Sequence, residues 1–524
     1  MLRRRLTLGL VAAIAAIVLA GCGSSSSSSS SSTIGSLYTL IGDTPLCDIL
    51  SFRLTATGLD LVPTTGTTNA TILNSNVTAI KVGFSILQEF STVLALTSVV
   101  SQTYNQGSFA VSAPVVVRYD PTQNPPISSV TATTSAATTM FPVEPPVTIS
   151  ASAISVMQMD LDLQHSVQFT TNSQGQVTGA TVTPVVTVGA LSASSTGFTE
   201  LDDLVGFVLS VNPNTFTSGT PGTSSATTFA GSMSIQLLSS SVSGAGGPAV
   251  NVSFPTDYFA QNIICASATV SNQPCSSMLL NQVLTPSFVE VDALIDPNGN
   301  LVAKSVQLED VENVAQSMLA FIGYVLTKPT TDSSGNVAFD LFILEEEPDD
   351  DFAVPLDSVV TVTAPASTVY SVGQPANDFA NLGFGAAQLA VGEEVVVHGI
   401  FTRPTPPPPP AVAPLTTVAA AKIYLKLQTH LGNFSSLLAD ASDDHTGAFV
   451  LAPCASLFNN APIYVFTDST TNFVNLSGLS ALTAQPTLTV KGLLEFQPKA
   501  TTINGVTVPA GSLVLLARQV HQLT

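Results

Sequence analysis

One ordered pattern of five features occurs three times between residues 205 and 520. Each copy opens with a strand that carries a glycine, and these glycines are Gly206, Gly323 and Gly432. The copies therefore start 117 residues (206 to 323) and 109 residues (323 to 432) apart, whereas solenoid repeats are only ~20–50 residues long. The pattern predicts three small domains, each a closed or nearly closed barrel of about five or six strands.

The later features of each copy are a β-run, a Thr-x-aromatic triplet, a strand that ends in a small residue, and an Ala followed by a basic residue. In copy order, the β-runs are Ala249–Val252, Val359–Val362 and Ile463–Phe466, and the triplets are Thr256/Tyr258, Thr368/Tyr370 and Thr471/Phe473. The strands that end in a small residue are Val289–Ala293, Val395–Gly399 and Leu488–Gly492. The closing pairs are Ala303-Lys304, Ala421-Lys422 and Ala517-Arg518.

Short alternating runs indicate an all-β fold along the rest of the chain. Apolar residues alternate with polar ones from Leu50 to Ala56, and the phase slips at Gly58, which predicts a bulge. Turn-forming residues at 173–175, 296–300 and 332–336 separate such runs. The best helix candidate is the segment from Lys81 to Leu96.

The composition limits the classes of protein to which this chain can belong. Charged residues make up 9% and hydrophobic residues 45% of the 524 residues, so the chain has enough apolar material for several cores. The formal net charge is −21. Because phosphate contacts need clustered Lys and Arg, this balance predicts that nucleic acid is not a partner.

The N-terminus has the pattern of an export signal. Three arginines, Arg3 to Arg5, precede an apolar run from Leu6 to Leu19 that is shorter than a membrane span of about 20 residues. The following Leu-Ala-Gly-Cys stretch resembles the bacterial lipobox. That resemblance implies cleavage before Cys22, lipidation of Cys22 and a membrane partner through this anchor. Because Gly23 rather than Asp follows the cysteine, the resemblance implies the outer membrane, with the body periplasmic or surface-exposed. Nine serines, Ser24 to Ser32, then form a flexible tether.

Four further cysteines fit an oxidising compartment, where disulfides persist. Cys265 and Cys275 are close in sequence and are the preferred disulfide pair, although four cysteines allow three connectivities. The pairing of Cys47 and Cys454 stays open. The chain has no Cys-x-x-Cys sequence and no His at ligand spacing from a Cys, which disfavours a zinc site.

Two stretches resemble uncharacterised families. Residues 37–61 and 147–186, including the Gly42-Asp43-Thr44-Pro45 turn, resemble the bacterial lipoprotein domain of unknown function 4382. The later copies resemble domain of unknown function 5666, which occurs in tandem in such lipoproteins. The resemblance implies a β-sandwich of immunoglobulin-like or prealbumin-like type followed by OB-like barrels, and it implies no catalytic residues.

These features divide the chain into six parts. We expect a signal peptide at 1–21, the lipidated cysteine and tether at 22–34, and a β-sandwich at 35–197. Three OB-like barrels follow at 198–312, 313–427 and 428–524. The proline tract Pro406–Pro410 lies in the last loop of the second barrel, in the slot that residues 296–300 occupy in the first copy and 497–511 in the third.

Candidate chemistry is sparse. An acidic run offers hard oxygen ligands for Ca²⁺, although a solvated acidic loop is favoured over a metal site. Its members are Glu345, Glu346, Glu347, Asp349, Asp350 and Asp351. The 296–300 and 443–445 segments have ligand-type residues, but polar turns are favoured there as well. No Gly-x-Ser-x-Gly sequence and no phosphate-binding loop is present.

The sequence therefore predicts a non-enzymatic, lipid-anchored envelope protein with a structural, adhesive or binding role. Its protein or polysaccharide partner is not identified, and Ca²⁺ is the one candidate cofactor. A Ca²⁺-dependent binding module and, with less support, a hydrolase of envelope polymers are the alternatives.

Overall fold

The computed structural model describes residues 34–523. The gaps in this range are 45, 67, 75–79, 84–90, 136, 152, 192–198, 220–225, 238–248, 256–258, 263–287, 297, 310–318, 348–354, 373–382, 403–415, 441–442 and 485. The signal segment and Cys22 lie outside the described residues. The described chain is almost entirely β-structure, with one four-residue helix, α2 (Leu163–Ser166), in the N-terminal domain. No described helix is long and apolar enough to cross a membrane.

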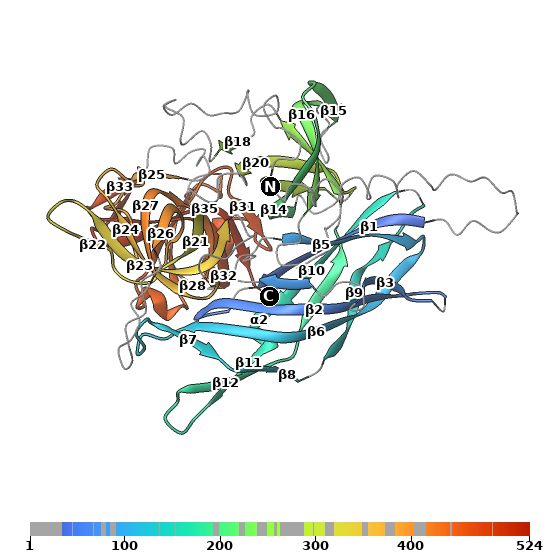
Figure 1. The fold of residues 1–524 in the computed structure, drawn as a ribbon, viewed down its shortest axis with the longest axis horizontal. Helices are drawn as coiled ribbons and strands as arrows, with labels where there is room; N and C mark the ends of the chain where they lie inside the picture. The colour runs from blue at the N-terminus through green and yellow to red at the C-terminus, as the bar shows by residue number, and fades with distance from the viewer. Residues whose placement is uncertain are drawn as a thin grey trace, which may run out of the picture.

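The N-terminal domain is a β-sandwich (Figure 1). One sheet contains β1 (Ile34–Thr44), β5 (Ser91–Val100), β10 (Ile154–Asp162) and β13 (Val186–Ala190), in which β1 lies parallel to β10 and antiparallel to β5. The other contains β2 (Ile49–Pro63), β3 (Ala70–Asn74), β4 (Ile80–Gly83), β6 (Thr103–Tyr119), β7 (Ile127–Val130) and β9 (Thr138–Thr148). A small third sheet joins β8 (Ala132–Thr134), β11 (Val167–Thr171) and β12 (Val177–Val182).

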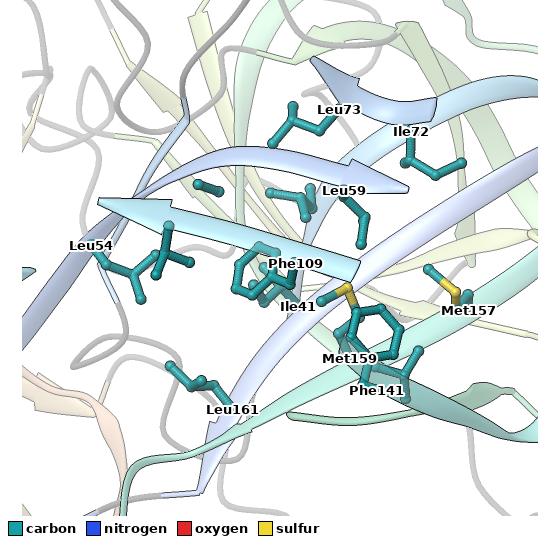
Figure 2. Close-up of a cluster of buried hydrophobic side chains, with 14 of the residues drawn as sticks. Ile41, Leu54, Leu59, Ile72, Leu73, Phe109, Phe141, Met157, Met159 and Leu161 are labelled. Atoms are coloured by element: carbon teal, nitrogen blue, oxygen red, sulfur yellow. The ribbon is translucent and has the colours of Figure 1, made fainter. Parts of the chain in front are cut away.

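The sandwich core forms where alternating side chains from both sheets meet. Figure 2 shows Ile41, Leu54, Phe109, Met159 and their neighbours converging between the strands. The expected alternation is confirmed from Phe52 to Ala56, where the apolar side chains are buried and Arg53 and Thr55 are half-buried. At the start of the run it fails, because Ser51 is buried as well. The expected bulge is confirmed too, since the register between β2 and β6 shifts between Ala56 and Gly58.

The expected helix from Lys81 to Leu96 is wrong. Its described parts are β4, which pairs with β2, and β5, which pairs with β1. Pairing with distant strands outweighs the local helical pattern here, because helix propensity is weak and tertiary contacts often override it.

Three barrels with one strand order follow. Their main strands are β14 (Thr199–Asn212), β16 (Ala226–Leu237), β17 (Ala249–Pro255), β19 (Phe288–Ile295) and β20 (Leu301–Glu309) in barrel 1; β21 (Leu319–Val325), β23 (Val337–Glu347), β24 (Val359–Ala364), β26 (Glu394–Thr402) and β27 (Thr416–Leu425) in barrel 2; and β28 (Leu427–Asp440), β29 (Gly447–Pro453), β30 (Ile463–Thr467), β32 (Thr487–Gln497) and β35 (Ser512–Gln522) in barrel 3.

In each barrel the first strand pairs with the second and the fourth, and the third lies parallel to the fifth. The fifth strand pairs with the fourth, which closes a five-stranded barrel in the order 1-2-3-5-4. This is a small Greek-key barrel of OB type. The predicted fold class, a sandwich followed by three OB-like barrels, is confirmed.

Short strands extend the barrels. They are β15 (Phe216–Gly219) and β18 (Phe259–Asn262) in barrel 1, β22 (Thr330–Thr331) and β25 (Val369–Val372) in barrel 2, and β31 (Asn472–Val474), β33 (Thr501–Ile503) and β34 (Val506–Val508) in barrel 3, which also has the 3-10 helices η3 (Ser456–Phe458) and η4 (Leu479–Ala484). The loop between the fourth and fifth strands is the slot expected for the proline tract, whose five prolines lie outside the described residues.

The opening glycines have a steric cause. A Cβ at Gly206, Gly323 or Gly432 would overlap a backbone carbonyl oxygen of the second strand in the same barrel. Only glycine lets the first strand bend closely enough across its neighbour to pair on both sides.

The expected alignment of the closing features is wrong by one residue in the second copy. Bulges in the fifth strands place Ala421, rather than Lys422, at the position of Lys304 and Arg518. The fifth strands of the three copies are therefore aligned on the extra unpaired residue of each bulge, and not on the Ala-plus-base sequence.

Candidate functional site

The sandwich meets barrels 2 and 3 at a junction that we call the distal joint. Cys47, just before β2, forms a disulfide with Cys454, just after β29, across a sequence separation of 407 and a Cα–Cα distance of 5.5 Å. The disulfide therefore links the first domain of the described chain covalently to the last.

Polar contacts flank this disulfide. The Oδ1 atom of Asp48 accepts hydrogen bonds from the Ser456 backbone N–H (2.6 Å) and from its Oγ hydroxyl (2.7 Å). Arg53 of β2 forms an ion pair with Asp357 of barrel 2. The disulfide, the Asp48 carboxylate and this ion pair together fix the sandwich against both barrels.

An apolar cluster fills the same joint. Leu50 and Val117 of the sandwich pack with Tyr324 and Phe342 of barrel 2 and with Leu457 of barrel 3. These side chains are at most 9% exposed, so the joint excludes water over most of its area.

A small pocket of about 70 Å³ opens at the distal joint. The disulfide, His430, Tyr119, Tyr324 and Phe458 contribute to its wall. The Nε2 atom of His430 is buried and has no hydrogen-bond partner among the described residues. Burial lowers the pKa of His430 to about 3, so the imidazole is neutral near neutral pH.

A second polar cluster lies between barrels 2 and 3, and we call this contact the middle joint. Gln428 bridges it, because its Oε1 accepts from the Glu394 backbone N–H (2.7 Å) and its Nε2 donates to the Gly392 carbonyl (2.8 Å). The Phe496 N–H donates to the Gln388 carbonyl at 3.0 Å. Backbone and amide groups of both barrels therefore hold this contact together.

Two buried carboxyl groups, Glu393 of barrel 2 and Glu495 of barrel 3, lie at the middle joint. Glu393 is fully buried, and burial, then the nearby Glu495 charge, raise its pKa well above the usual range. Neither oxygen of Glu393 accepts a hydrogen bond of normal geometry from the described residues, although the Ala390 and Phe496 N–H groups partly offset the desolvation. Burial raises the pKa of Glu495 to about 7.

A third cluster lies on the wall of barrel 2. His398 stacks edge-on against Tyr424 at 5.1 Å between ring centroids, and Lys422 Nζ donates to the Tyr424 hydroxyl at 2.6 Å. Burial, then the Lys422 charge, lower the pKa of His398 to about 4. The Nε2 atom of His398 is buried and has no hydrogen-bond partner among the described residues.

The acidic run does not form a solvated loop in its described part. Glu345 and Glu346 lie in β23 and are at most 9% exposed, because pairing with Ile322 and Phe321 of β21 continues through them. Glu347 ends the strand, and Asp349, Asp350 and Asp351 lie outside the described residues. Within residues 34–523 and their gaps, no three His, Cys, Asp or Glu side chains are grouped so that they could hold a metal ion.

The other polar segments are turns, as favoured. Asp296 Oδ1 accepts from the N–H groups of Asn298 (3.0 Å) and Asn300 (2.7 Å), and Asp332 does the same in its own turn. Asp443 accepts from the Thr446 N–H (2.9 Å), while Asp444 accepts from Ser480. These carboxylate oxygens bind their own loops or a neighbouring one.

The preferred disulfide pair, Cys265 and Cys275, and the lipidation residue Cys22 lie outside the described residues. Sequence reasoning missed the Cys47–Cys454 disulfide, His430, and the Glu393 and Glu495 pair. The disulfide had a sequence signal, because these two cysteines remain once Cys265 and Cys275 are paired, and His430 had one in the comparison of the three copies.

No family model matches this sequence, and no curated protein does. Among solved structures, the wild-type single-stranded DNA binding protein from Thermus aquaticus is 10% identical, with 43% of this chain and 93% of that chain covered and a TM-score of 0.12. A deletion mutant of it is 13% identical, with coverages of 44% and 96% and a TM-score of 0.13. A structure described as drosophila Unr CSD456 is 9% identical, with coverages of 62% and 97% and a TM-score of 0.13.

These neighbours correct one expectation. The charge balance predicted that nucleic acid is not a partner, whereas two of the three solved structures belong to a single-stranded DNA binding protein. The exclusion of nucleic acid is therefore withdrawn, because net charge alone does not decide what an OB-type barrel binds. At these TM-scores the likeness itself carries no argument for such a partner.

Proposed function

We propose that this chain is a non-enzymatic, lipid-anchored protein of the bacterial cell envelope, in which four β domains act as one structural or binding unit. The Cys47–Cys454 disulfide carries this proposal. Disulfides persist in oxidising compartments and are rare in a reducing cytosol, so a structural disulfide between the first and last domains supports export.

The N-terminal sequence supports the same compartment independently. A basic segment, an apolar run and Leu19-Ala20-Gly21-Cys22 precede the serine tether. Several acyl chains on Cys22 would anchor the protein stably, where one chain alone binds a membrane only marginally. Gly23 supports the outer membrane as the destination in a diderm host.

The junctions support a structural or binding role. Their polar groups make contacts between domains, such as Asp48 with Ser456 and Gln428 with the Glu394 backbone. We further propose that the three barrels are tandem copies of one module, because they share one strand order and an opening glycine in the same place. The proposed resemblance to domains of unknown function 4382 and 5666 agrees with this organisation.

The experiment is mass spectrometry of the mature N-terminus after expression in a diderm bacterial host. We expect a chain that begins at Cys22 and carries a diacylglyceryl group and an N-acyl group. The matched variant Cys22→Ala should stay unlipidated and should leave the membrane fraction. A wild-type chain without lipid on Cys22 would contradict the proposal.

Protease treatment of intact cells then distinguishes the two roles. Digestion of the barrels, with a periplasmic control protein intact, would support an adhesive role at the surface. Protection until the outer membrane is opened would support a structural role in the periplasm.

Among the residues that the structure describes, no contact favours the Ca²⁺-dependent alternative or a hydrolase over this proposal. A calcium role would require the melting temperature of the protein to rise with Ca²⁺ and to fall with a chelator.

A further inference from the structure

One face of the sandwich sheet that contains β1 is covered by barrel 1 over only part of its length. Tyr38, Leu40 and Val156 on this face pack into the core of barrel 1. Because side chains alternate between the two faces of a strand, Ile34 lies on the same face as Tyr38, and Ile154 lies on the same face as Val156. The face therefore continues past barrel 1 to the end of the sheet where β1 begins.

Three aliphatic residues are exposed at this end, and we call them the tip patch. They are Ile34, Val100 and Ile154, with exposed fractions of 53%, 46% and 42%. Ile34 lies directly opposite Val100 in the antiparallel pair of β1 and β5, and Ile154 lies opposite Ser36 in the parallel pair of β1 and β10. The three side chains are therefore neighbours on one surface.

The turns around the tip patch are free of charged residues. Backbone hydrogen bonds of 2.9 Å bring three segments together here: the Ser36 N–H donates to the Ala153 carbonyl, and the Thr64 N–H donates to the Thr103 carbonyl. The segments 34–42, 61–80, 91–117 and 145–159 contain no charged residue, although charged residues make up 9% of the chain. This end of the sandwich can therefore approach an anionic lipid surface without charge repulsion, in a protein whose net charge is −21.

Barrel 1 exposes no charge beside the patch either. Its turn at Asp296 borders Ile154, because a Cβ at Gly299 would be 2.4 Å from the Ile154 Cγ2 atom. Asp296 is buried, and its carboxylate accepts hydrogen bonds from Asn298 and Asn300 of the same turn. The neighbouring acid is therefore used within its own turn and does not face outwards.

The start of the described chain indicates what covers the patch. Ile34 is the first described residue, and only the eleven residues 23–33 separate it from Cys22. Even fully extended, a segment of this length spans at most about 40 Å. An anchor at Cys22 therefore holds the patch close to the bilayer, at an effective concentration in the ~mM range, so that even a weak apolar contact forms.

We propose that the tip patch lies against the lipid bilayer, with Ile34, Val100 and Ile154 at the boundary between head groups and acyl chains. This inference rests on the proposed anchor at Cys22. It also orients the molecule, because β1 spans roughly 35 Å from the tip patch to the side of the distal joint. Barrels 2 and 3, at the other end of the sandwich (Figure 1), are then directed away from the membrane.

The test uses tryptophan fluorescence, because the chain has no Trp of its own. The mature chain carrying Cys265→Ser/Cys275→Ser is coupled through the Cys22 thiol to a maleimide lipid in phosphatidylcholine vesicles with brominated acyl chains. Bromine quenches only a Trp that lies in or next to the acyl chains. The coupling supplies the anchor whether or not cells lipidate Cys22, so a failure of the proposed function leaves this test intact.

The two sheets of the sandwich provide a matched pair of probe positions. We expect the fluorescence of Val100→Trp to fall about twofold on brominated vesicles relative to unbrominated ones, because the patch contacts the acyl chains. The control Met140→Trp places the probe at a 63% exposed position of β9, in the other sheet, and should keep its fluorescence. Equal fluorescence changes at the two positions would overturn the proposal.

A second probe position guards against a variant that fails to fold. Ile34→Trp should be quenched as Val100→Trp is, and adding Val100→Asp beside it should remove most of the quenching, because a carboxylate is costly to bury in lipid. Quenching of Ile34→Trp that Val100→Asp leaves unchanged would contradict the proposal. So would a dimer of the uncoupled chain in sedimentation that Val100→Asp dissociates, because a second copy would then cover the patch.

Discussion

The sandwich contacts its neighbours through two joints of different construction. At the proximal joint Tyr38, Leu40, Val93 and Val156 pack directly into the apolar core of barrel 1, which follows it in sequence. At the distal joint it meets barrel 3 through a disulfide, the Asp48 carboxylate and a smaller apolar cluster. The sandwich and barrel 1, which are consecutive in sequence, are held together by apolar packing and by pairing of β5 with β14. Closing the loop of 407 residues between Cys47 and Cys454 costs more chain entropy, and the disulfide lowers that cost by restricting the unfolded chain.

Strand β1 explains how the proximal joint forms. Leu37 and Ile41 face the sandwich core, while Tyr38 and Leu40 belong to the cluster shared with barrel 1. Both faces of the strand are therefore buried, and the sandwich and barrel 1 share one continuous apolar region. The middle joint between barrels 2 and 3 differs from both, because it buries two carboxyl groups.

The largest expected effect comes from opening the distal joint. For the Cys47→Ser/Cys454→Ser variant, the chain-entropy relation gives a loss of about 6 kcal/mol for a loop of 407 residues. This is an upper value, because it applies only if all domains unfold together. Calorimetry should show barrel 3 melting at a lower temperature than in the wild type. The control Cys265→Ser/Cys275→Ser should keep the wild-type transition of barrel 3, and an unchanged transition in the first variant would contradict the role of the disulfide.

The proximal joint should respond to a cavity. Leu40 is fully buried between the sandwich and barrel 1, so Leu40→Ala should cost about 2–5 kcal/mol. Calorimetry should show the transitions of the sandwich and of barrel 1 falling together, while barrels 2 and 3 keep theirs. If the transition temperatures of the sandwich and of barrel 1 shifted independently, the two domains would not share a core.

The middle joint should weaken as the pH rises. The folded pKa of Glu495 is about 7 against an ordinary value of 4.5, so its contribution is fully present below pH 4.5 and is lost as the pH passes 7. The whole shift corresponds to about 3 kcal/mol. Denaturant melts of wild type and Glu495→Gln at pH 5 and pH 8 should show a smaller loss of stability in the variant. Equal losses in both proteins would exclude Glu495 as the titrating group.

The smallest expected effect concerns the Asp48 carboxylate. Asp48→Ala removes the acceptor for two hydrogen bonds from Ser456 at the edge of the distal joint, which should cost about 1–2 kcal/mol. Thermal melts should show this loss only with the disulfide intact, because the two groups hold the same contact. Additive losses in the Asp48→Ala and double-cysteine variants would show that the two act independently.

Local sequence patterns predicted the fold well where local geometry decides it. The alternation from Phe52 to Ala56, the Asp296 turn and the three opening glycines each follow from backbone geometry and burial over a few residues. The helix expected from Lys81 was wrong because its strands pair with residues far away in sequence. The loop expected at Glu345 was wrong for the same reason, since β21 extends the pairing through this acid.

The candidate site could not be predicted in the same way. It is built from segments around Cys47, Tyr324 and His430, and nothing local to any one of them indicates the other two. A comparison of the three copies residue by residue would have found His430 as the single polar residue at its position. The buried pair of Glu393 and Glu495 has no such signal, because its cause is the contact between two barrels.

The most direct test of this account is disulfide mapping by mass spectrometry of the protein, purified from the cell envelope without reductant. The account predicts a crosslinked peptide that joins Cys47 to Cys454, and loss of that peptide after reduction. Free thiols at these two residues, or a crosslink from either of them to Cys265 or Cys275, would contradict an arrangement in which the sandwich is linked covalently to barrel 3.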